Sequence, residues 1–553
     1  MINKHWFEAD FETTGLDYYK KHGCTKVWLY AVCDENIDIV NYGTSIEDFI
    51  AWCRTVRGSR IYFHNLKFDG NFIIDWLLRN GYPFNFGLKA SDEKGFSILV
   101  DDMGSFYSIK INFSKSNQIE ICDSLKLIPF KVEKIAKDFD LPMRKGKIDY
   151  SDYTVDEDRL EYVYNDVKIV ASALNELKKE GIDRLTIASS AYHYFKGEYD
   201  NRDFKNWFPE LDSDFLDNYR KAYRGGRSQV NPKYQDRILH GVKRYDINSM
   251  YPYIMHEMPL PYGKPIKTNR MGTSKFELYE LEIQFKLKKG HLPTLLKKGA
   301  IYGFESSYYT ESNGVELLRL SSIDFELLKR HYDILAMKVN EVWSFFTTTS
   351  LFKPYIDYWY NVKLHSTGAK RALAKLMLNS LYGKFGANHK GSHKIPDLVN
   401  DVVEYSISDE EDMPKYYLPM AIAITSYAHK LIDDFIQITD IDKFVYCDTD
   451  SIHTLGDMPA QFIHETDLGK FKLEAVEEVS KYIRQKCYAT KENGKYTITC
   501  AGMPDNCKQK VIDTYGDELM KHFKIGLQVQ GKLVPVRVKG GVLLNETTFE
   551  IKQ

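Results

Sequence analysis

The chain is poor in cysteine, has no long apolar segment and carries almost no net charge, and each of these absences excludes a class of protein. Its eight cysteines form no CxxC pair, and no group of His and Cys has the spacing of a zinc site. We therefore expect reduced thiols, as in a cytosolic compartment. No apolar run approaches the roughly 18–20 residues that span a bilayer, so we expect no membrane association. The N-terminal stretch is polar, and acidic by residue 12, unlike a signal peptide.

Net charge and chain length limit the possible binding surfaces and the number of domains. Lys and Arg number 75 against 77 Asp and Glu, a net charge of −2, so any surface for nucleic acid must be local. Hydrophobic residues make up 43% of the chain and aromatic residues 14%, which favours folded material over disorder. At 553 residues the chain exceeds a single hydrophobic core, and we expect several domains of the α/β class.

Acidic residues recur in the N-terminal third at positions that suit a metal site. Asp10 and Glu12 close the first strand-like stretch. Asp69 follows a second strand-like run, Arg60–Phe63, and opens an amphipathic segment with helical spacing. Taken singly, each acid has a plain structural interpretation, as the polar end of a strand or as a helix N-cap.

A third acidic motif completes an ordered set. Tyr162 and Asp166 lie one helical turn apart in a helical run that begins near residue 156, so they share a face. The order DxE, NxxxD, YxxxD resembles the DnaQ-like 3′–5′ exonuclease domain of proofreading DNA polymerases. That resemblance implies two divalent metal ions held by Asp10, Glu12, Asp69 and Asp166. Tyr162 would orient the attacking water, and Lys145 would assist catalysis.

The same resemblance implies a groove for a single-stranded 3′ end. An aromatic side chain beside it could stack on a base, which Phe68 is placed to do. The residues expected to hold the strand are Thr13, Asn65 and Phe68. Weaker candidates for this groove are His64, Ser124 and Leu125.

A glycine pair follows in the segment Tyr223-Arg224-Gly225-Gly226-Arg227. Glycines let backbone approach a ligand closely, and the two arginines suit phosphate. By itself the segment fits any glycine turn. It resembles the YxGG motif between the exonuclease and polymerase domains of family B polymerases, which contacts template DNA; this assigns Tyr223, Gly225 and Gly226 to DNA binding.

Two further groups of acids lie in the C-terminal two-thirds. Asp448 and Asp450 stand where a β-prone run enters a tight turn, and Asp246 closes another strand-like run, Val242–Tyr245. Like charges held close together need a compensating cation, and Mg²⁺ or Mn²⁺ suits hard oxygen ligands. The segments resemble motif C, YxDTDS, and motif A, DxxSLYP with Met250 in place of Leu. The resemblance implies two metal ions held by Asp246, Asp448 and Asp450.

Cations gather between Asp357 and Asp397, where the chain has no acid. The run 369–381 is helical in composition and closely matches motif B, KxxxNSxYG. A basic, solvated helix is the plainer interpretation. The resemblance implies dNTP binding by Tyr251, Lys363, Arg371, Lys375 and Tyr382, with Tyr251 under the sugar. It implies DNA contacts by Ser249, Asn379 and Gly383, and by Lys486 and Tyr488 of a KxY motif.

All these motifs occur in the order typical of protein-primed family B DNA polymerases of bacteriophages, the phi29 type, and the resemblance spans essentially the whole chain. Matching stretches include YFHNLKFDG at 62–70, LAKLMLNSLYGKF at 373–385 and YCDTDSIH at 446–453. It implies an RNase H-like 3′–5′ exonuclease joined to a right-hand polymerase with two insertions. The implied domains are the exonuclease (1–186), palm (187–257 and 418–500), first insertion (258–350), fingers (351–386), second insertion (387–417) and thumb (501–553).

In this family such insertions bind a priming protein and help to encircle DNA. The expected partners are therefore primer-template and single-stranded DNA, dNTPs and a terminal protein bound as a heterodimer at initiation, with the chain otherwise monomeric. A phage-encoded enzyme of this kind would replicate viral DNA by strand displacement in the host cytoplasm.

Three alternatives remain open at this point. The chain could be a family B relative from a plasmid or mobile element that is primed by nucleic acid. It could be an exonuclease whose polymerase half has decayed, although motifs A, B and C are intact. It could be a DNA-binding scaffold, but acids in a DNA groove would weaken binding to phosphates unless metals accompany them.

Overall fold

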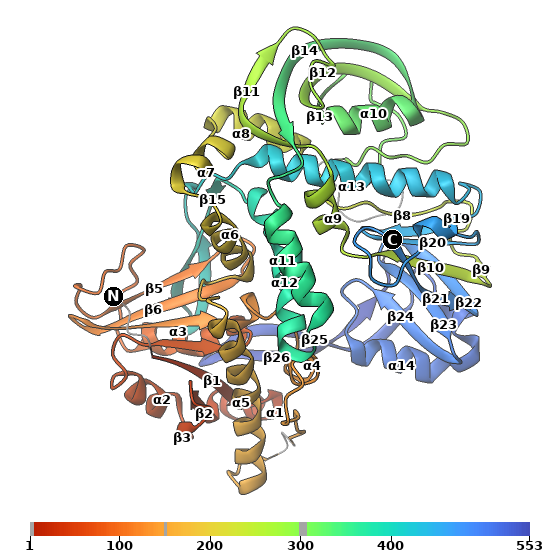
Figure 1. The fold of residues 1–553 in the computed structure, drawn as a ribbon. Helices are drawn as coiled ribbons and strands as arrows, with labels where there is room; N and C mark the ends of the chain where they lie inside the picture. The colour runs from red at the N-terminus through yellow and green to blue at the C-terminus, as the bar shows by residue number, and fades with distance from the viewer. Residues whose placement is uncertain (1–4, 149–151, 298–306, 553) are drawn as a thin grey trace.

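The computed structural model describes residues 5–148, 152–297 and 307–552 (Figure 1). Within these residues the N-terminal part forms a seven-stranded sheet. In spatial order its strands are β3 (Ile39–Gly43), β2 (Val27–Asp34), β1 (Trp6–Thr13), β4 (Arg60–Phe63), β7 (Asn117–Asp123), β6 (Phe106–Ser114) and β5 (Gly95–Val100). β1, β4 and β7 run parallel, and every other neighbouring pair is antiparallel. This is the RNase H-like arrangement that the sequence predicts.

Helices cover this sheet and lead away from it. They are α1 (Leu16–His22), α2 (Ile46–Cys53), α3 (Leu66–Arg79), α4 (Val132–Asp138), α5 (Glu157–Lys179), α6 (Ile187–Gly197), α7 (Asn201–Trp207) and α8 (Ser213–Tyr219). The Asp156 side chain caps α5 by accepting from the Arg159 backbone N–H at 2.8 Å. Val163, Val167 and Val170 recur at helical spacing and are buried against the sheet.

A second, five-stranded sheet forms the palm. Its strands are β21 (Phe471–Glu477), β10 (Val242–Ile247), β20 (Ser451–Thr454), β19 (Phe444–Asp448) and β8 (Ser228–Val230), each antiparallel to its neighbours. Two helices accompany it, α9 (Met250–Glu257) and α13 (Leu418–Ile438). α13 is buried along most of its length because it lies between this sheet and the sheet drawn at the top of Figure 1.

Two helices, α11 (Lys353–His365) and α12 (Gly368–Phe385), form a hairpin because only residues 366–367 separate them. The predicted helix at 369–381 is confirmed as the centre of α12. Figure 1 shows this hairpin descending from α13 between the N-terminal region and the palm.

The segments expected to be insertions are largely β-structure. In the first, β11 (Leu260–Thr268), β14 (Tyr332–Thr348), β12 (Phe276–Leu287) and β13 (Glu316–Ser321) form a sheet in that order, packed on α10 (Ser322–His331). In the second, β16 (Lys394–Val399) pairs with β17 (Val402–Ile407), and β15 (Lys390–Gly391) pairs with β18 (Glu411–Asp412).

The C-terminal part continues from the palm and returns to the N-terminal sheet. Its elements are the sheet β24 (Lys495–Cys500), β23 (Cys487–Glu492), β22 (Val479–Arg484) and β9 (Ile238–Leu239), then α14 (Asp505–Tyr515), α15 (Leu519–His522), β25 (Gln528–Val538) and β26 (Gly541–Glu550). Short 3-10 turns lie at Ser124–Lys126, Arg220–Ala222, Ala460–Phe462 and Gly516–Glu518. No helix in the described part of the chain is long and apolar enough to cross a membrane.

The tip of the β25–β26 hairpin joins three distant segments. The Thr25 backbone N–H donates to the carbonyl of Lys539 at 2.9 Å, and the Gly540 backbone N–H donates to Asp75 Oδ1 at 3.2 Å. Lys539 Nζ lies 2.7 Å from Asp401 Oδ2 at the tip of the β16–β17 hairpin, and Asp401 also receives Arg79 Nη1 at 3.0 Å. We call this group of contacts the hairpin junction.

Two candidate active sites

Four predicted carboxylates meet at one edge of the N-terminal sheet. Asp10 and Glu12 lie on β1, Asp69 lies on α3 and Asp166 lies on α5. Burial, followed by the Asp166 carboxylate, raises the pKa of Asp10 to about 7. Burial, followed by Asp10, raises the pKa of Asp69 well above its ordinary value. Among the residues the structure describes, Asp69 Oδ1 and Asp166 Oδ1 are buried without a hydrogen-bond partner.

Asp69 is not a helix N-cap, the plainer interpretation of its position. Asn65 holds the cap position of α3 with a left-handed backbone, φ +77°, so Asp69 lies in the first turn of the helix. Its side chain is only 4% exposed. A carboxylate buried among other carboxylates contributes nothing to capping, which favours a site over a structural role.

Lys145 and Tyr162 complete this cluster. Lys145 Nζ forms an ion pair with Asp166 Oδ2 and lies 5.3 Å from the centroid of the Tyr162 ring. The Tyr162 hydroxyl is hydrogen-bonded to Asp166 as well. Burial raises the pKa of Asp166, and Lys145 and Tyr162 act against that rise. The two residues that the sequence assigns to catalysis therefore both contact one carboxylate.

His64 and Ser124 contact each other beside this site. His64 Nδ1 lies 3.0 Å from Ser124 Oγ, and Nε2 lies 2.7 Å from the carbonyl oxygen of Phe130. Burial lowers the pKa of His64, which favours the neutral ring that donates from Nε2 and accepts at Nδ1. The Leu125 backbone N–H donates to Asp123 Oδ1 at 3.0 Å. Both ring nitrogens of His64 have hydrogen-bond partners within the protein, so its direct contact with DNA stays a prediction.

Two buried acids that the sequence analysis missed lie beside the cluster. Asp123 Oδ1 accepts from the backbone N–H groups of Asn65 at 3.1 Å and Leu66 at 3.3 Å, and so fixes the start of α3. Glu8 precedes Asp10 by two positions on β1 and is 1% exposed; burial, followed by Asp10, raises its pKa well above its ordinary value. The period-two spacing of acids along β1 was the available signal for Glu8.

A cationic, aromatic pocket of about 490 Å³ adjoins the first turn of α3. Its lining includes the predicted strand-binding residues Asn65 and Phe68, and it also draws on the β16–β17 and β25–β26 hairpins. Among its lining side chains are Lys67, Lys394, Tyr405 and Arg537. Thr13 is the last residue of β1, directly after Glu12. Cations and aromatic rings together suit a single strand of nucleic acid.

The palm brings the second predicted set of carboxylates together. Ser451 pairs both with Asp246 on β10 and with Asp448 on β19, and the Ile247 backbone N–H donates to the carbonyl of Asp450 at 2.9 Å. Burial, then Asp450, raises the pKa of Asp246 to about 7. Burial, then Asp448, raises the pKa of Asp450. The strand register therefore places three acids at one turn.

Two neighbours modify the charge of this turn. Lys486 Nζ lies 2.7 and 2.8 Å from the two carboxylate oxygens of Asp448. Glu474 on β21 adds a negative charge that raises the pKa values of both Asp246 and Asp450. The sequence analysis missed Glu474, because only the pairing of β21 with β10 places it here.

The predicted nucleotide-binding side chains face the same turn. Lys363 Nζ donates to Ser249 Oγ at 2.8 Å, and burial, followed by the charges of Lys375 and Arg371, lowers the pKa of Lys363 to about 8. Asp246 acts in the opposite direction on this pKa, as expected if the three cations lie near that carboxylate. The rings of Tyr251 and Tyr382 stack with centroids 4.0 Å apart.

The remaining DNA-contact candidates surround this centre. Asn379 and Gly383 are exposed on α12, and apart from the adjacent residues and the backbone of the helix itself, no described atom lies within 4 Å of a Cβ built on Gly383. Tyr223 packs on Gly386, where an added Cβ would lie 2.7 Å from its ring. Tyr488 packs against Tyr446 with ring centroids 5.2 Å apart.

The expectation that Arg224 and Arg227 bind phosphate is wrong. Arg224 is 5% exposed and donates to the carbonyl groups of Leu296, Ala222 and Arg319, whereas Arg227 is 3% exposed and pairs with Asp433 at 3.0 Å. Both guanidinium groups thus bind the protein itself.

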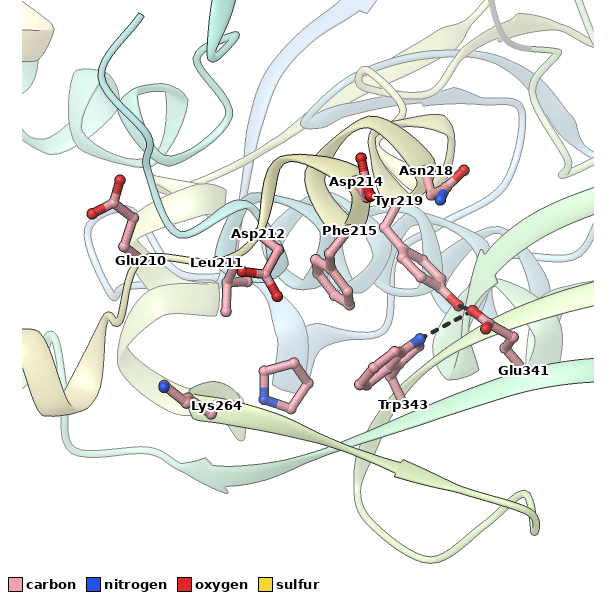
Figure 2. A pocket seen from close by; sticks show the side chains of 11 residues that line it. Glu210, Leu211, Asp212, Asp214, Phe215, Asn218, Tyr219, Lys264, Glu341 and Trp343 are labelled. Carbon is pink, nitrogen blue, oxygen red and sulfur yellow. Dashed lines mark hydrogen bonds between the residues drawn. The ribbon is translucent and has the colours of Figure 1, made fainter. Parts of the chain in front are cut away.

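Figure 2 shows a separate pocket of about 440 Å³ between α8 and strands β11 and β14. The hydroxyl of Tyr219 and Nε1 of Trp343 both donate to Glu341 Oε2, at 3.3 and 3.2 Å. Further carboxylates in its lining are Glu210, Asp212 and Asp214, with Lys264 as the basic side chain. This negative lining would repel phosphates, so the pocket is no candidate for DNA or dNTP.

The donor sets at both carboxylate clusters suit divalent metal ions. In residues 5–148, 152–297 and 307–552, no group of three or more His, Cys, Asp and Glu side chains is arranged to hold a metal ion by itself. That is compatible with Mg²⁺, which usually keeps waters and binds one or two carboxylates together with substrate phosphates. The raised pKa values and the unpartnered oxygen of Asp69 fit acids that require a cation.

Comparisons with known proteins agree with this geometry. Residues 51–467 match the family described as DNA polymerase type B, organellar and viral. The DNA polymerase of Bacillus phage M2 is 37% identical over 100% of both chains, and that of Streptococcus phage Cp-1 is 32% identical over 99% of both. The solved structure of phi29 DNA polymerase complexed with single-stranded DNA superimposes with a TM-score of 0.91, at 33% identity and 100% coverage of both chains. Its ternary complex with primer-template DNA and incoming nucleotides gives 0.90.

Proposed function

Because this chain belongs to the type B DNA polymerases of organelles and viruses, we propose that its second carboxylate site synthesises DNA and that its first proofreads. The observation that carries the proposal is the meeting of Asp246, Asp448 and Asp450 at one turn opposite the cations of α12. The proposed reaction is attack of a primer 3′-OH on the α-phosphate of a dNTP, with release of pyrophosphate.

The chain's own side chains would divide this work. Lys363, Arg371 and Lys375 would bind the triphosphate, and the stacked Tyr251 and Tyr382 would form the floor beneath the sugar and base. Lys486 and Tyr488 would support the primer strand. Two ions of Mg²⁺ or Mn²⁺ at each site would supply Lewis acidity and neutralise phosphate charge.

We propose 3′–5′ exonuclease activity for the N-terminal site. Asp10, Glu12, Asp69 and Asp166 would hold its two ions, and Lys145 and Tyr162 would act beside Asp166. The cationic pocket at Asn65 and Phe68 would receive the frayed 3′ end. Attack of water on the terminal phosphodiester would then release one nucleotide.

We further propose initiation on a terminal protein, with a hydroxyl side chain in place of the primer 3′-OH, followed by strand-displacing elongation of viral DNA in the host cytoplasm. The support is full-length similarity to polymerases of Bacillus phages and the two β-rich segments at 258–350 and 387–417. We also propose the domain ranges that the resemblance implies.

A labelled primer on a template with a downstream annealed strand tests both activities with Mg²⁺. Extension through the duplex with dNTPs, and shortening of the primer without them, are the expected results. Shortening without extension would overturn the polymerase assignment, and extension without shortening would overturn the exonuclease assignment.

Substitution of the acids separates the two sites. Asp450→Ala should lower synthesis roughly 100- to 1,000-fold or more while single-strand degradation persists, because one charge at the palm turn is lost. The double variant Asp10→Ala, Asp69→Ala should show the reverse. Asp457→Ala, which removes an exposed surface acid paired with Lys243, is the matched control and should leave both rates unchanged.

A further inference from the structure

The turn that carries Asp448 and Asp450 is held by a neighbouring loop, residues 225–227. The Thr449 backbone N–H donates to the carbonyl of Arg227 at 2.7 Å, and a Cβ built on Gly226 would lie 2.8 Å from Thr449 Oγ1. Thr449 has a left-handed backbone, φ +59°, which is unfavourable for a β-branched residue and requires outside support. The loop therefore supports a strained residue between two acids.

Helix α13 holds this loop at its first residue. His429 Nε2 lies 2.6 Å from the carbonyl oxygen of Gly225, and its Nδ1 lies 3.1 Å from Asp324 Oδ1 on α10. Both partners are oxygen atoms, so each ring nitrogen faces a hydrogen-bond acceptor. Asp324 is fixed in turn by hydroxyl groups of Ser321 and Ser426, at 3.0 and 2.6 Å.

One helical turn further along α13, Asp433 makes a second contact with the loop. Asp433, fully buried, accepts Arg227 Nη1 at 3.0 Å on one oxygen, and Arg330 Nη1 at 2.8 Å and His331 Nε2 at 2.9 Å on the other. Arg227 Nη2 also donates to Gln229 Oε1 at 2.9 Å. Because Asp433 at the centre of this network is fully buried, the network fixes geometry: removing one member leaves a buried group unpaired.

We infer that His429 and Asp433 are positioning residues for nucleotidyl transfer, which fix the loop 225–227 and through it the turn of Asp448 and Asp450. Within the residues that the structure describes, no hydrogen bond or ion pair joins either side chain to these acids. Their influence passes through the Gly225 carbonyl and the Arg227 side chain to the Thr449 backbone. The inference rests on the palm being the site of synthesis.

The alternative is a buried network that contributes only to folding. The test compares His429→Leu, which removes both polar ring nitrogens, with His429→Gln, which keeps an amide donor near the position of Nε2. Glu120→Gln is the control, because it breaks a buried ion pair with Arg60 (2.8 Å) inside the N-terminal sheet. Single-nucleotide insertion, single-strand degradation and the melting temperature are measured for each variant.

A positioning role predicts that His429→Leu lowers kcat for insertion roughly 10- to 100-fold with a smaller change in KM for dNTP. Degradation of single strands should persist, and His429→Gln should recover most of the loss. Mn²⁺ binding followed by electron paramagnetic resonance should weaken in His429→Leu, independently of turnover. If His429→Leu does not fold, His429→Gln together with Gly226→Ala, which would displace Thr449, carries the same test.

Two results would overturn the inference. One is unchanged kcat in a folded His429→Leu protein. The other is loss of synthesis and degradation in parallel with the melting temperature, as Glu120→Gln would show for a purely structural pair. Loss of synthesis in Asp450→Ala but not in His429→Leu would leave the polymerase assignment intact and refute only the positioning role.

Discussion

At the scale of single residues, each carboxylate cluster is met by one lysine of the same chain. Lys145 pairs with Asp166, and Lys486 pairs with both oxygens of Asp448. A lysine on a flexible stem can withdraw when a stronger cation arrives, so these pairs offset the negative charge of the clusters without blocking metal binding. We therefore expect substitution of Lys486 to affect synthesis and substitution of Lys145 to affect degradation.

Tyr251 determines sugar selection in our proposal. Its ring is stacked on Tyr382, which fixes its position beneath the expected sugar. Tyr251→Val should raise incorporation of ribonucleotides relative to deoxyribonucleotides by roughly 10- to 100-fold, since space opens for a 2′-OH. Competition between rNTP and dNTP measures this ratio. Tyr253→Val offers a control on the same helix, and equal ratios in all three proteins would refute the steric role.

Lys178 gives the N-terminal region a pH-dependent stability. Its ammonium lies 5.2 Å from the centroid of the Trp6 ring and 5.0 Å from that of Tyr62, and burial, followed by Arg60, lowers its pKa to about 8. Because the folded state holds this proton more weakly than the unfolded state, stability rises with pH between about 8 and 10.5. At pH 7, below both pKa values, the full free-energy cost of burying the charged ammonium lowers the stability of the folded state.

Replacing Lys178 with Met should therefore stabilise the protein at pH 7 by about 1–2 kcal/mol, allowing for partial solvent screening. The difference in melting temperature between the two proteins should shrink by pH 9.5. Lys179→Met removes an exposed neighbour and should show no such trend. A constant difference across this range would contradict the shifted pKa.

Much of each site could be predicted from residues that are close in sequence. Asp448 and Asp450, or Asp10 and Glu12, are brought together by one strand and its turn, so their spacing alone indicates their proximity. Glu474 and Asp123 could not be found this way, because their neighbours come from other strands through sheet register. The phosphate-binding expectation for Arg227 was wrong because the sequence gives no sign of its ion pair with Asp433, a buried residue far along the chain.

At the scale of elements, α12 presents a cationic face to the palm. Its sequence has no acid, and burial, followed by the charges of Lys375 and Arg371 on α12, lowers the pKa of Lys363 on α11, as expected for cations of the two helices that lie close together. The helix itself was predictable from composition and periodicity. Its orientation toward Asp246 was not, since that depends on how the α11–α12 hairpin packs.

Substitution of Lys375 tests the role of the cationic face of α12. Lys375→Ala should raise KM for dNTP roughly 10-fold or more with less effect on primer binding, because the charge that meets the triphosphate is lost. Lys370→Ala removes a cation on a different face of the same helix and should change KM little. Steady-state insertion at varied dNTP concentration measures both. Equal effects would indicate a general electrostatic role for the helix.

At the scale of the whole molecule, the hairpin junction ties the C-terminal hairpin to the N-terminal region and to the β16–β17 hairpin. Lys539→Ala should change the melting temperature by about 1 °C or less, because an exposed ion pair contributes under about 1 kcal/mol. Cleavage of the β25–β26 hairpin by a protease should nevertheless become faster, and more so at low salt where the native pair is strongest. Lys521→Ala removes an exposed local pair with Glu518, three residues earlier in the chain, and serves as control; equal cleavage in both variants would refute the junction's role.

The hairpin junction also bears on how the chain is made. Asp75 and Gly540 are 465 positions apart, so at roughly 5–20 residues per second a ribosome needs on the order of 25–90 s between them. Through that interval α3 must hold its place by its own contacts with the N-terminal sheet. We therefore expect the N-terminal region to mature first and to receive the C-terminal hairpin last, so that a chain that terminates early can fold its N-terminal sheet before the palm is complete.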